Sequence, residues 1–230
     1  MPKKSEQGKL IVLEGTDGTG KATQTDLLAE KLEEEGYHIR MVSFPQYNTK
    51  SAGPVEEHIN GKYGQAEEVD PYKASILFAV DRFDASFKIK KWLEKGYTVL
   101  ANRYVASNMG HQGNKISDPQ ERKKFFAWLH NLEYEIFGIP KSDINIILHV
   151  EAKTAQQLAQ NKSTPEWKGK THDIYQDDLE NLKKAEQAYL EIAEEFREFT
   201  LVECTENGQM MPREKILEIV WKEVQNIIQG

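Results

Sequence analysis

The feature that most constrains this chain is a glycine-rich turn that follows an apolar run near the N-terminus. Residues 9–14 are mostly apolar, and the turn after them, Gly15-Thr-Asp-Gly-Thr-Gly20-Lys21, leads into a stretch rich in Leu and Ala. The apolar run predicts a buried strand and the stretch after the turn predicts a helix. Glycines let the backbone curl so that successive N–H groups point inward, beside the positive end of the helix dipole. The turn therefore predicts a cradle for phosphate groups, with the Lys21 ammonium reaching toward them.

The rest of the chain repeats the pattern of strand followed by helix. Apolar runs bounded by turn residues predict further strands at 38–44, 98–101, 145–150 and 199–203. The longest predicted helix spans residues 71–94, and a second spans 177–198 and begins with acidic residues that suit a helix N-terminus. This alternation predicts an α/β fold with a five-stranded parallel sheet and helices on both faces. We expect residues 1–230 to form one domain.

One polar segment interrupts this alternation. Residues 161–172 contain Pro165 and Gly169 and few apolar side chains, which is typical of a mobile loop. We expect a short lid at about 161–173, with Lys162, Lys168 and Lys170 as its cationic side chains.

Composition limits the kinds of ligand and the location. Charged residues make up 29% of the chain and the formal net charge is -7, which disfavours long nucleic acids because their binding needs many cationic contacts to phosphates. A single nucleotide needs only a local cationic pocket. No apolar run approaches the roughly 18 residues of a membrane-spanning helix, and no signal-peptide core follows the N-terminal lysines. The single cysteine, Cys204, cannot form an internal disulfide, so the cytoplasm is the expected location.

Three further motifs make the interpretation specific. They are Phe44-Pro-Gln-Tyr47, Phe78-Ala-Val-Asp-Arg82-Phe83 and Asn102-Arg103-Tyr104-Val-Ala-Ser107-Asn108. With the cradle, and in this order and spacing, the chain resembles the thymidylate kinases, a family of P-loop nucleoside monophosphate kinases, over nearly its whole length. The resemblance implies a P-loop NTPase-type fold, phosphoryl transfer from ATP to dTMP with Mg²⁺, and a homodimer.

The resemblance also assigns the donor site and the catalytic side chains. It implies that ATP contacts the cradle and the first residues of the helix: Gly15, Thr16, Asp17, Gly18, Thr19, Gly20, Lys21, Ala22 and Thr23. Phosphoryl transfer needs little covalent chemistry from the protein, which holds donor and acceptor in line and stabilises negative charge. The side chains expected for this task are Lys21 and Arg103, with Lys168 and Lys170 from the lid in place of the family's arginine; alternatively, Arg82 and Arg103 supply that charge.

The resemblance places the acceptor dTMP against two helices and the third strand. Phe78 and Arg82 are four residues apart, so on a helix they share one face; by resemblance Phe78 stacks on thymine and Arg82 bonds its O4 edge. Arg103 follows a strand and can hold the acceptor phosphate bidentately. His111 could crowd the 2′ position of the sugar or have a structural role. The full set implied for dTMP is Asp17, Phe44, Tyr47, Phe78, Arg82, Arg103, Ser107, Asn108 and His111.

The chain departs from the family pattern at several positions. Ala22 stands where the usual motif has a hydroxyl for Mg²⁺, and Asn102 stands where most members have an aspartate. We therefore expect no protein side chain to ligate Mg²⁺, which ATP phosphates and water would hold. Gly18 stands where some members have a cradle arginine, and the lid has none between Lys162 and Asp173. His149, where an aspartate is common, has no role that the sequence suggests.

These departures leave two alternatives open. One is a kinase for a different nucleoside monophosphate, which would share the cradle and the lid. The other is a nucleotide-binding protein that has lost most of its turnover.

Overall fold

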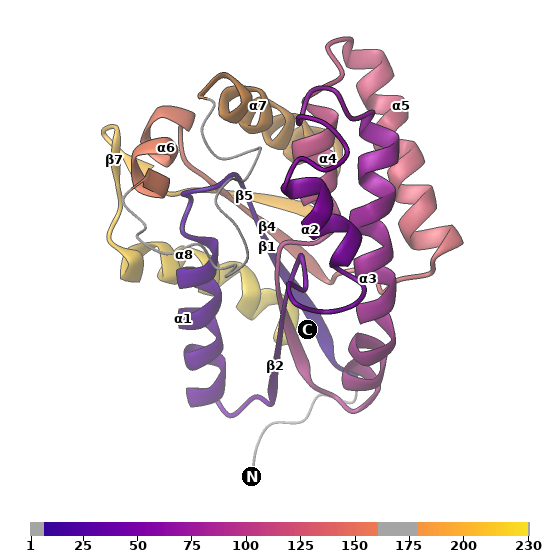
Figure 1. The fold of residues 1–230 in the computed structure, drawn as a ribbon. Coiled ribbons are helices and arrows are strands. Elements are labelled where there is room, and N and C mark those ends of the chain that lie inside the picture. Colours follow the sequence, from indigo (N-terminus) through magenta and orange to yellow (C-terminus); the bar gives the residue numbers. More distant parts are fainter. Residues whose placement is uncertain (1–6, 161–178, 230) are drawn as a thin grey trace.

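A computed structural model describes residues 7–160 and 179–229. Its centre is a parallel sheet in the order β2-β3-β1-β4-β5 (Figure 1). The strands are β1 (Lys9–Glu14), β2 (Ile39–Ser43), β3 (Thr98–Asn102), β4 (Ile144–His149) and β5 (Phe199–Glu203). The five-stranded parallel sheet predicted from the sequence is confirmed, with strand ends that differ from the prediction by at most one residue.

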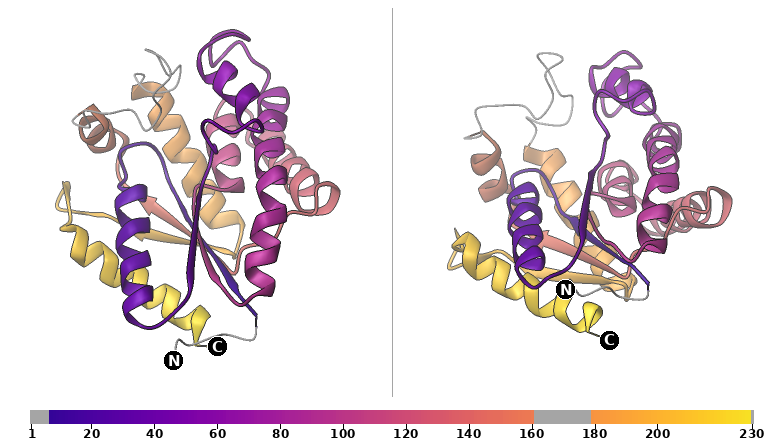
Figure 2. Two further views of the ribbon diagram at one scale, coloured as in Figure 1. Left: turned by 60° about the horizontal axis from the view of Figure 1, so that its bottom comes forward. Right: turned by 90° about the horizontal axis from the view of Figure 1, so that it is seen from below.

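Helices cover both faces of the sheet, as predicted (Figure 2). One face packs on α1 (Lys21–Glu34) and α8 (Arg213–Ile228), and the other packs on α3 (Pro71–Glu94), α4 (Val105–Gly113) and α7 (Leu179–Glu195). The remaining elements are α2 (Gly53–Ile59), α5 (Pro119–His130), the π-helix η1 (Asn131–Ile136), α6 (Ala152–Gln160) and a hairpin of β6 (Thr205–Glu206) and β7 (Gln209–Met210).

Alternation along β1 shows how the sequence builds the two halves of the core. Leu10 and Val12 join the core cluster on the α3 and α4 side, whereas Ile11 and Leu13 join the cluster beneath α1 and α8. All four side chains are fully buried. A strand buried on both faces needs a continuous apolar run, which is why the sequence predicts this strand so closely.

The structure agrees with the predicted helix 71–94 at both ends. Asp70 accepts a hydrogen bond from the Lys73 amide at 3.1 Å and Pro71 occupies the first turn, a combination that starts helices. The second predicted helix, 177–198, corresponds to α7, which ends earlier, at Glu195; its first two predicted residues lie outside the described residues, as does the predicted lid at 161–173.

The β6–β7 hairpin is a feature that we did not predict. Its turn is Asn207-Gly208, with both residues at positive φ, and this dipeptide is a strong hairpin signal.

No described helix combines the length and the apolar character needed to cross a bilayer.

Candidate active site

The glycine-rich turn connects β1 to α1 at the carboxyl edge of the sheet, where open α/β folds bind ligands. Gly18 and Gly20 both have φ of 86°, a left-handed conformation that glycine adopts without steric cost. Thr19 Oγ1 donates to the Thr16 carbonyl at 3.0 Å, and Lys21 Nζ donates to the same oxygen at 2.7 Å. The Lys21 ammonium therefore lies over the turn, in position to exchange this carbonyl for phosphate oxygens.

Gly18 lies against the backbone of α6. A Cβ atom added there would be 2.0 Å from the Ala155 carbonyl oxygen, far inside van der Waals contact. The structure therefore has no room for a side chain at the position where some thymidylate kinases have an arginine, which explains the glycine physically.

Arg103 is the side chain that joins the end of β3 to the cradle. Its Nη2 donates to Asp17 Oδ1 at 2.5 Å, and its Nη1 lies 3.2 Å from Ser107 Oγ and 3.1 Å from His111 Nε2. Burial, the largest single influence, would raise the pKa of Asp17 and lower that of Arg103, but the ion pair and the other charged groups nearby together outweigh it, so the pKa of Asp17 is lowered and that of Arg103 is raised. A fixed positive charge thus lies beside the predicted phosphate site.

His111 contacts the arginine rather than a carboxylate. Burial, together with the charge of Arg103, lowers the pKa of His111 to about 3, so its ring is neutral at physiological pH. A neutral ring can accept the Arg103 hydrogen bond at Nε2 while Nδ1 carries the proton. The structure thus gives His111 a role in orienting Arg103.

The backbone of Arg103 is held in a sparsely populated conformation by a residue that the sequence analysis missed. Arg103 has φ of 69°, and in the next turn Glu14 Oε1 accepts hydrogen bonds from the amides of Tyr104 at 2.6 Å and Ser107 at 3.2 Å. Glu14 Oε2 accepts from Ser107 Oγ at 2.6 Å. Burial raises the pKa of Glu14, although Ser107 and Arg103 act in the opposite direction. A glutamate that ends an apolar strand directly before the glycine turn is the signal that could have revealed it.

The residues predicted to contact the base form a second group across α3 and α4, beside η1. Phe78 is partly exposed and meets His58 edge to face at 6.0 Å between ring centroids. Arg82 and Asn108 are both 2% exposed, and Arg82 forms a salt bridge with Glu133. Because Ser107 and Asn108 are adjacent on α4, this helix links the base group to the Arg103 group.

A cleft of about 600 Å³ opens between the start of α1 and the loop after β2. Ala22, Tyr47 and Asn102 line it, whereas Phe78 and Arg82 do not. Asn102 Oδ1 is buried and has no hydrogen-bond partner within the described residues.

Two other predicted site residues, Thr23 and Phe44, lie at the edges of this arrangement. Thr23 is exposed on α1, and Phe44 is 4% exposed and packs in the core at 5.7 Å from the Tyr104 ring. The catalytic lysines predicted in the lid, Lys168 and Lys170, lie outside the described residues.

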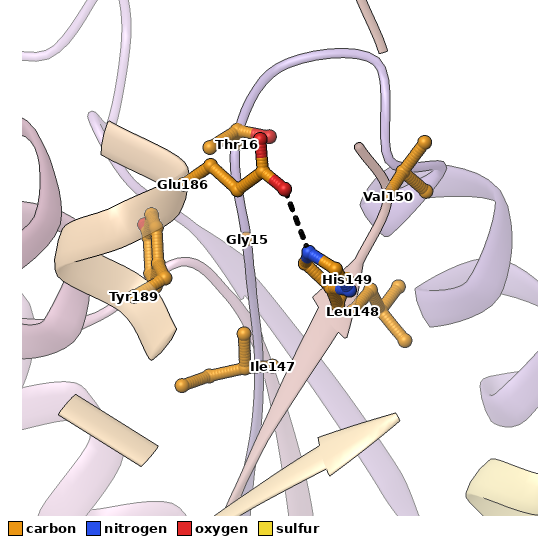
Figure 3. A pocket seen from close by; sticks show the side chains of 8 residues that line it. All are labelled: Gly15, Thr16, Ile147, Leu148, His149, Val150, Glu186 and Tyr189. Atoms are coloured by element: carbon orange, nitrogen blue, oxygen red, sulfur yellow. Dashed lines mark hydrogen bonds and ion pairs between the residues drawn. The ribbon is translucent and has the colours of Figure 1, made fainter. Parts of the chain in front are cut away.

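His149, which had no sequence-based role, connects three elements beside the cradle. Its Nε2 lies 2.9 Å from Glu186 on α7 and its Nδ1 lies 2.7 Å from Glu203 on β5. Figure 3 shows Glu186 reaching His149 next to Thr16, around a cavity of about 10 Å³. Glu186 also accepts from the Ala152 amide at 2.8 Å, at the start of α6. His149 thus ties α6, α7 and β5 together.

Comparison with known proteins agrees with this geometry. The family described as thymidylate kinase matches residues 13–214. Thymidylate kinase from Mycobacterium tuberculosis is 30% identical over 186 residues, which are 80% of this chain and 85% of that protein. Human thymidylate kinase is 27% identical and covers 66% of this chain and 65% of its own length.

A solved structure shows the same fold. Thymidylate kinase from Candida albicans superposes with a TM-score of 0.75 at 21% identity, over 96% of this chain and 93% of that one. The fold, the cradle and the match along most of the sequence agree, and the chain belongs to the thymidylate kinase family.

Proposed function

We propose that this protein transfers the γ-phosphoryl group of ATP to dTMP, giving ADP and dTDP for dTTP synthesis. The observation that carries the proposal is the contact between Arg103 and Asp17. It links the strand-end arginine to the phosphate cradle, with 2.5 Å between Nη2 and Oδ1. A guanidinium at this place can hold an acceptor phosphate in line with the γ-phosphate of ATP.

On the donor side, the amides of the cradle and the first turn of α1 bind the ATP phosphates. Lys21 leaves the Thr16 carbonyl and bonds the β- and γ-phosphates. Lys21 is 7% exposed, and a charge shielded from water acts more strongly on the transferred group. Together with Arg103 it stabilises the negative charge that develops during transfer.

On the acceptor side, Phe78 stacks on thymine while Arg82 and Asn108 bond its polar edge. Tyr47 and Arg103 bind the phosphate of dTMP. The remaining members of the proposed set surround the sugar and the phosphate or support them: Asp17, Phe44, Ser107 and His111.

Mg²⁺ bound together with ATP would neutralise phosphate charge during the transfer. The described residues contain no group of three or more His, Cys, Asp or Glu side chains arranged to hold a metal. Asn102 lines the cleft with Ala22, and its Oδ1 has no hydrogen-bond partner among the described residues. This oxygen can accept a hydrogen bond from a water molecule bound to the metal. In this proposal Asn102 orients that water, and the phosphates supply the direct ligands.

The protein acts as a homodimer in this proposal, and an apolar stripe along α3 supports it. Ile76, Val80, Phe83 and Phe87 recur at helical spacing and are each 37–56% exposed. Ile136 on η1 is 67% exposed, and the neighbouring Phe137 lies 5.2 Å from the Phe83 ring. A contiguous exposed apolar surface marks an interaction site, and a second copy packing the same stripe about a two-fold axis would cover it.

The activity can be tested by offering ATP and Mg²⁺ with dTMP, dUMP, CMP, AMP and GMP in turn. ADP production with dTMP as the preferred acceptor is the expected result. Preference for another acceptor would reassign the substrate, and no turnover with any acceptor would indicate a nucleotide-binding protein.

A further inference from the structure

A carboxylate that belongs to none of the sequence motifs lies at the centre of the base group. Glu133, on η1, is fully buried. It accepts hydrogen bonds from Arg82 at both oxygens, with Oε2 2.6 Å from Nε and Oε1 2.5 Å from Nη2. This bidentate geometry fixes the plane of the guanidinium, because two parallel bonds allow neither rotation nor tilt.

The backbone around Glu133 directs this one side chain inward. Residues Asn131–Ile136 form a π-helix, a widened turn that is frequent at functional sites. Glu135 and Ile136, in the same turn, are exposed. The turn therefore presents one of its two glutamates to the interior and the other to solvent.

Glu133 also contacts the second polar residue of the base group. Asn108 Nδ2 donates to the Ser75 carbonyl at 3.1 Å and, at a longer distance of 3.5 Å, to Glu133 Oε1. Both hydrogen bonds use the amide nitrogen of Asn108 as the donor, so the hydrogen-bond network assigns the orientation of this amide. Its Oδ1 then points the other way and remains an acceptor.

These contacts leave N–H groups of Arg82 to donate to a ligand and the amide oxygen of Asn108 to accept from it. Arg82 uses Nε and Nη2 on Glu133, so Nη1 is left to donate, and Asn108 keeps Oδ1 to accept. Thymine and uracil present a 4-keto acceptor next to an N3–H donor, which matches this pair. Cytosine presents a 4-amino donor next to an N3 acceptor, which opposes both groups.

We propose that Glu133 is a positioning residue that orients Arg82 and Asn108 so that the site selects 4-keto over 4-amino pyrimidine nucleotides. The proposal rests on the proposed function, because it takes Arg82 and Asn108 as the residues that meet the base. A residue with a purely structural role would affect all substrates alike, whereas a positioning residue affects the acceptor and the choice of base.

The test compares Glu133→Gln with Glu135→Gln, which changes the exposed glutamate of the same turn. In the Glu133 variant we expect KM for dTMP to rise by about tenfold or more, the effect of losing one oriented charge-assisted hydrogen bond. The preference in kcat/KM for dTMP over dCMP should fall by a similar factor, and KM for ATP should stay near the wild-type value. The Glu135 variant should match the wild type in all three.

Circular dichroism and thermal melting establish that each variant is folded. If Glu133→Gln does not fold, Glu133→Asp decides the question, because it keeps the charge but shortens the side chain and breaks the bidentate geometry. Unchanged KM for dTMP and unchanged base preference in the folded variant would overturn the proposal, as would an equal rise in KM for ATP and dTMP. A wild-type protein without dTMP turnover would overturn the proposed function, and this inference with it.

Discussion

At the scale of single residues, the described part of the site depends on carboxylates whose partners are far away in the sequence. Glu14 bonds the amide of Tyr104, 90 positions later, and Glu133 bonds Arg82 across 51 positions. The sequence predicted the residues of the glycine turn and the strand-end arginine because local motifs contain them. Glu14 was missed although its place between an apolar strand and the glycine turn was a usable signal, whereas nothing local distinguishes Glu133 from a solvated glutamate.

The prediction at the scale of single residues concerns Lys21. Lys21→Ala should lower kcat by about 100- to 1,000-fold, the usual effect of losing one preorganised charge at a transition state. The thermal midpoint should stay close to the wild-type value, because the ammonium lies over the glycine turn, where it donates to the Thr16 carbonyl, and not in the apolar core. Steady-state kinetics and calorimetry measure the two quantities, with Lys123→Ala on the surface of α5 as the control. Near-normal turnover would show that the donor phosphates bind elsewhere.

At the scale of elements, the sequence predicted the sheet closely and the details around it less well. Buried parallel strands are short apolar runs, so β1 and β5 have the predicted ends. The packing of α6 on the cradle depends on a backbone contact between Gly18 and Ala155, and no side-chain pattern encodes it. The single-domain extent, the lid and the cytoplasmic location stay predictions.

The contact between α6 and the cradle predicts that one methyl group added at Gly18 lowers the free energy of unfolding by an unusually large amount. Gly18→Ala should lower the free energy of unfolding more than Gly138→Ala, by about 1–3 kcal/mol. Both glycines have positive φ, but a Cβ at Gly138 meets nothing within 4 Å. Subtracting the loss seen in Gly138→Ala therefore removes the free-energy cost of a positive φ. The remaining loss in Gly18→Ala is the cost of the steric clash with Ala155. Urea denaturation measures the difference, and equal losses in the two variants would contradict the close approach.

Hydrogen bonds link α6, α7 and β5 through His149 and Glu186. They predict that the free energy of unfolding depends on pH. Burial alone would lower the pKa of His149, but Glu203 and Glu186 outweigh it and the pKa is raised. A raised pKa means that the protonated ring stabilises the folded state. That contribution is complete below the ordinary pKa of about 6.5 and is lost as pH rises through the folded value.

The difference in unfolding free energy between wild type and His149→Gln should therefore be larger near pH 6 than near pH 9. We expect a difference of about 1–2 kcal/mol at the lower pH, since the bonds are charge-assisted but partly exposed. Urea denaturation at a series of pH values measures it. A difference that does not change with pH would show that the pKa of His149 is the same in the folded and the unfolded protein.

At the scale of the whole molecule, apolar residues recur at helical spacing along α3, and this spacing alone does not distinguish a core face from an exposed surface. Which residues are covered depends on the helices around α3, and the structure leaves Ile76, Val80, Phe83 and Phe87 exposed. The proposed dimer follows from that exposure.

Phe87→Glu should shift the protein from dimer to monomer, because a buried carboxylate without a partner is costly in an apolar interface. Lys222→Glu places a carboxylate at an exposed position of α8, on the other face of the sheet, and should leave the assembly unchanged. Sedimentation velocity over a range of concentrations distinguishes the two states. A wild-type protein that sediments as a monomer throughout would rule out the dimer.

The turn that Glu14 holds affects how variant libraries of this protein should be read. Glu14 and the Tyr104 amide support the left-handed backbone of Arg103, yet in our proposal neither touches a nucleotide. A screen scored on growth or turnover alone would rank Glu14 with the nucleotide-binding residues. Recording the cellular amount of each variant beside its activity separates the residues that build the turn from those that bind the nucleotides.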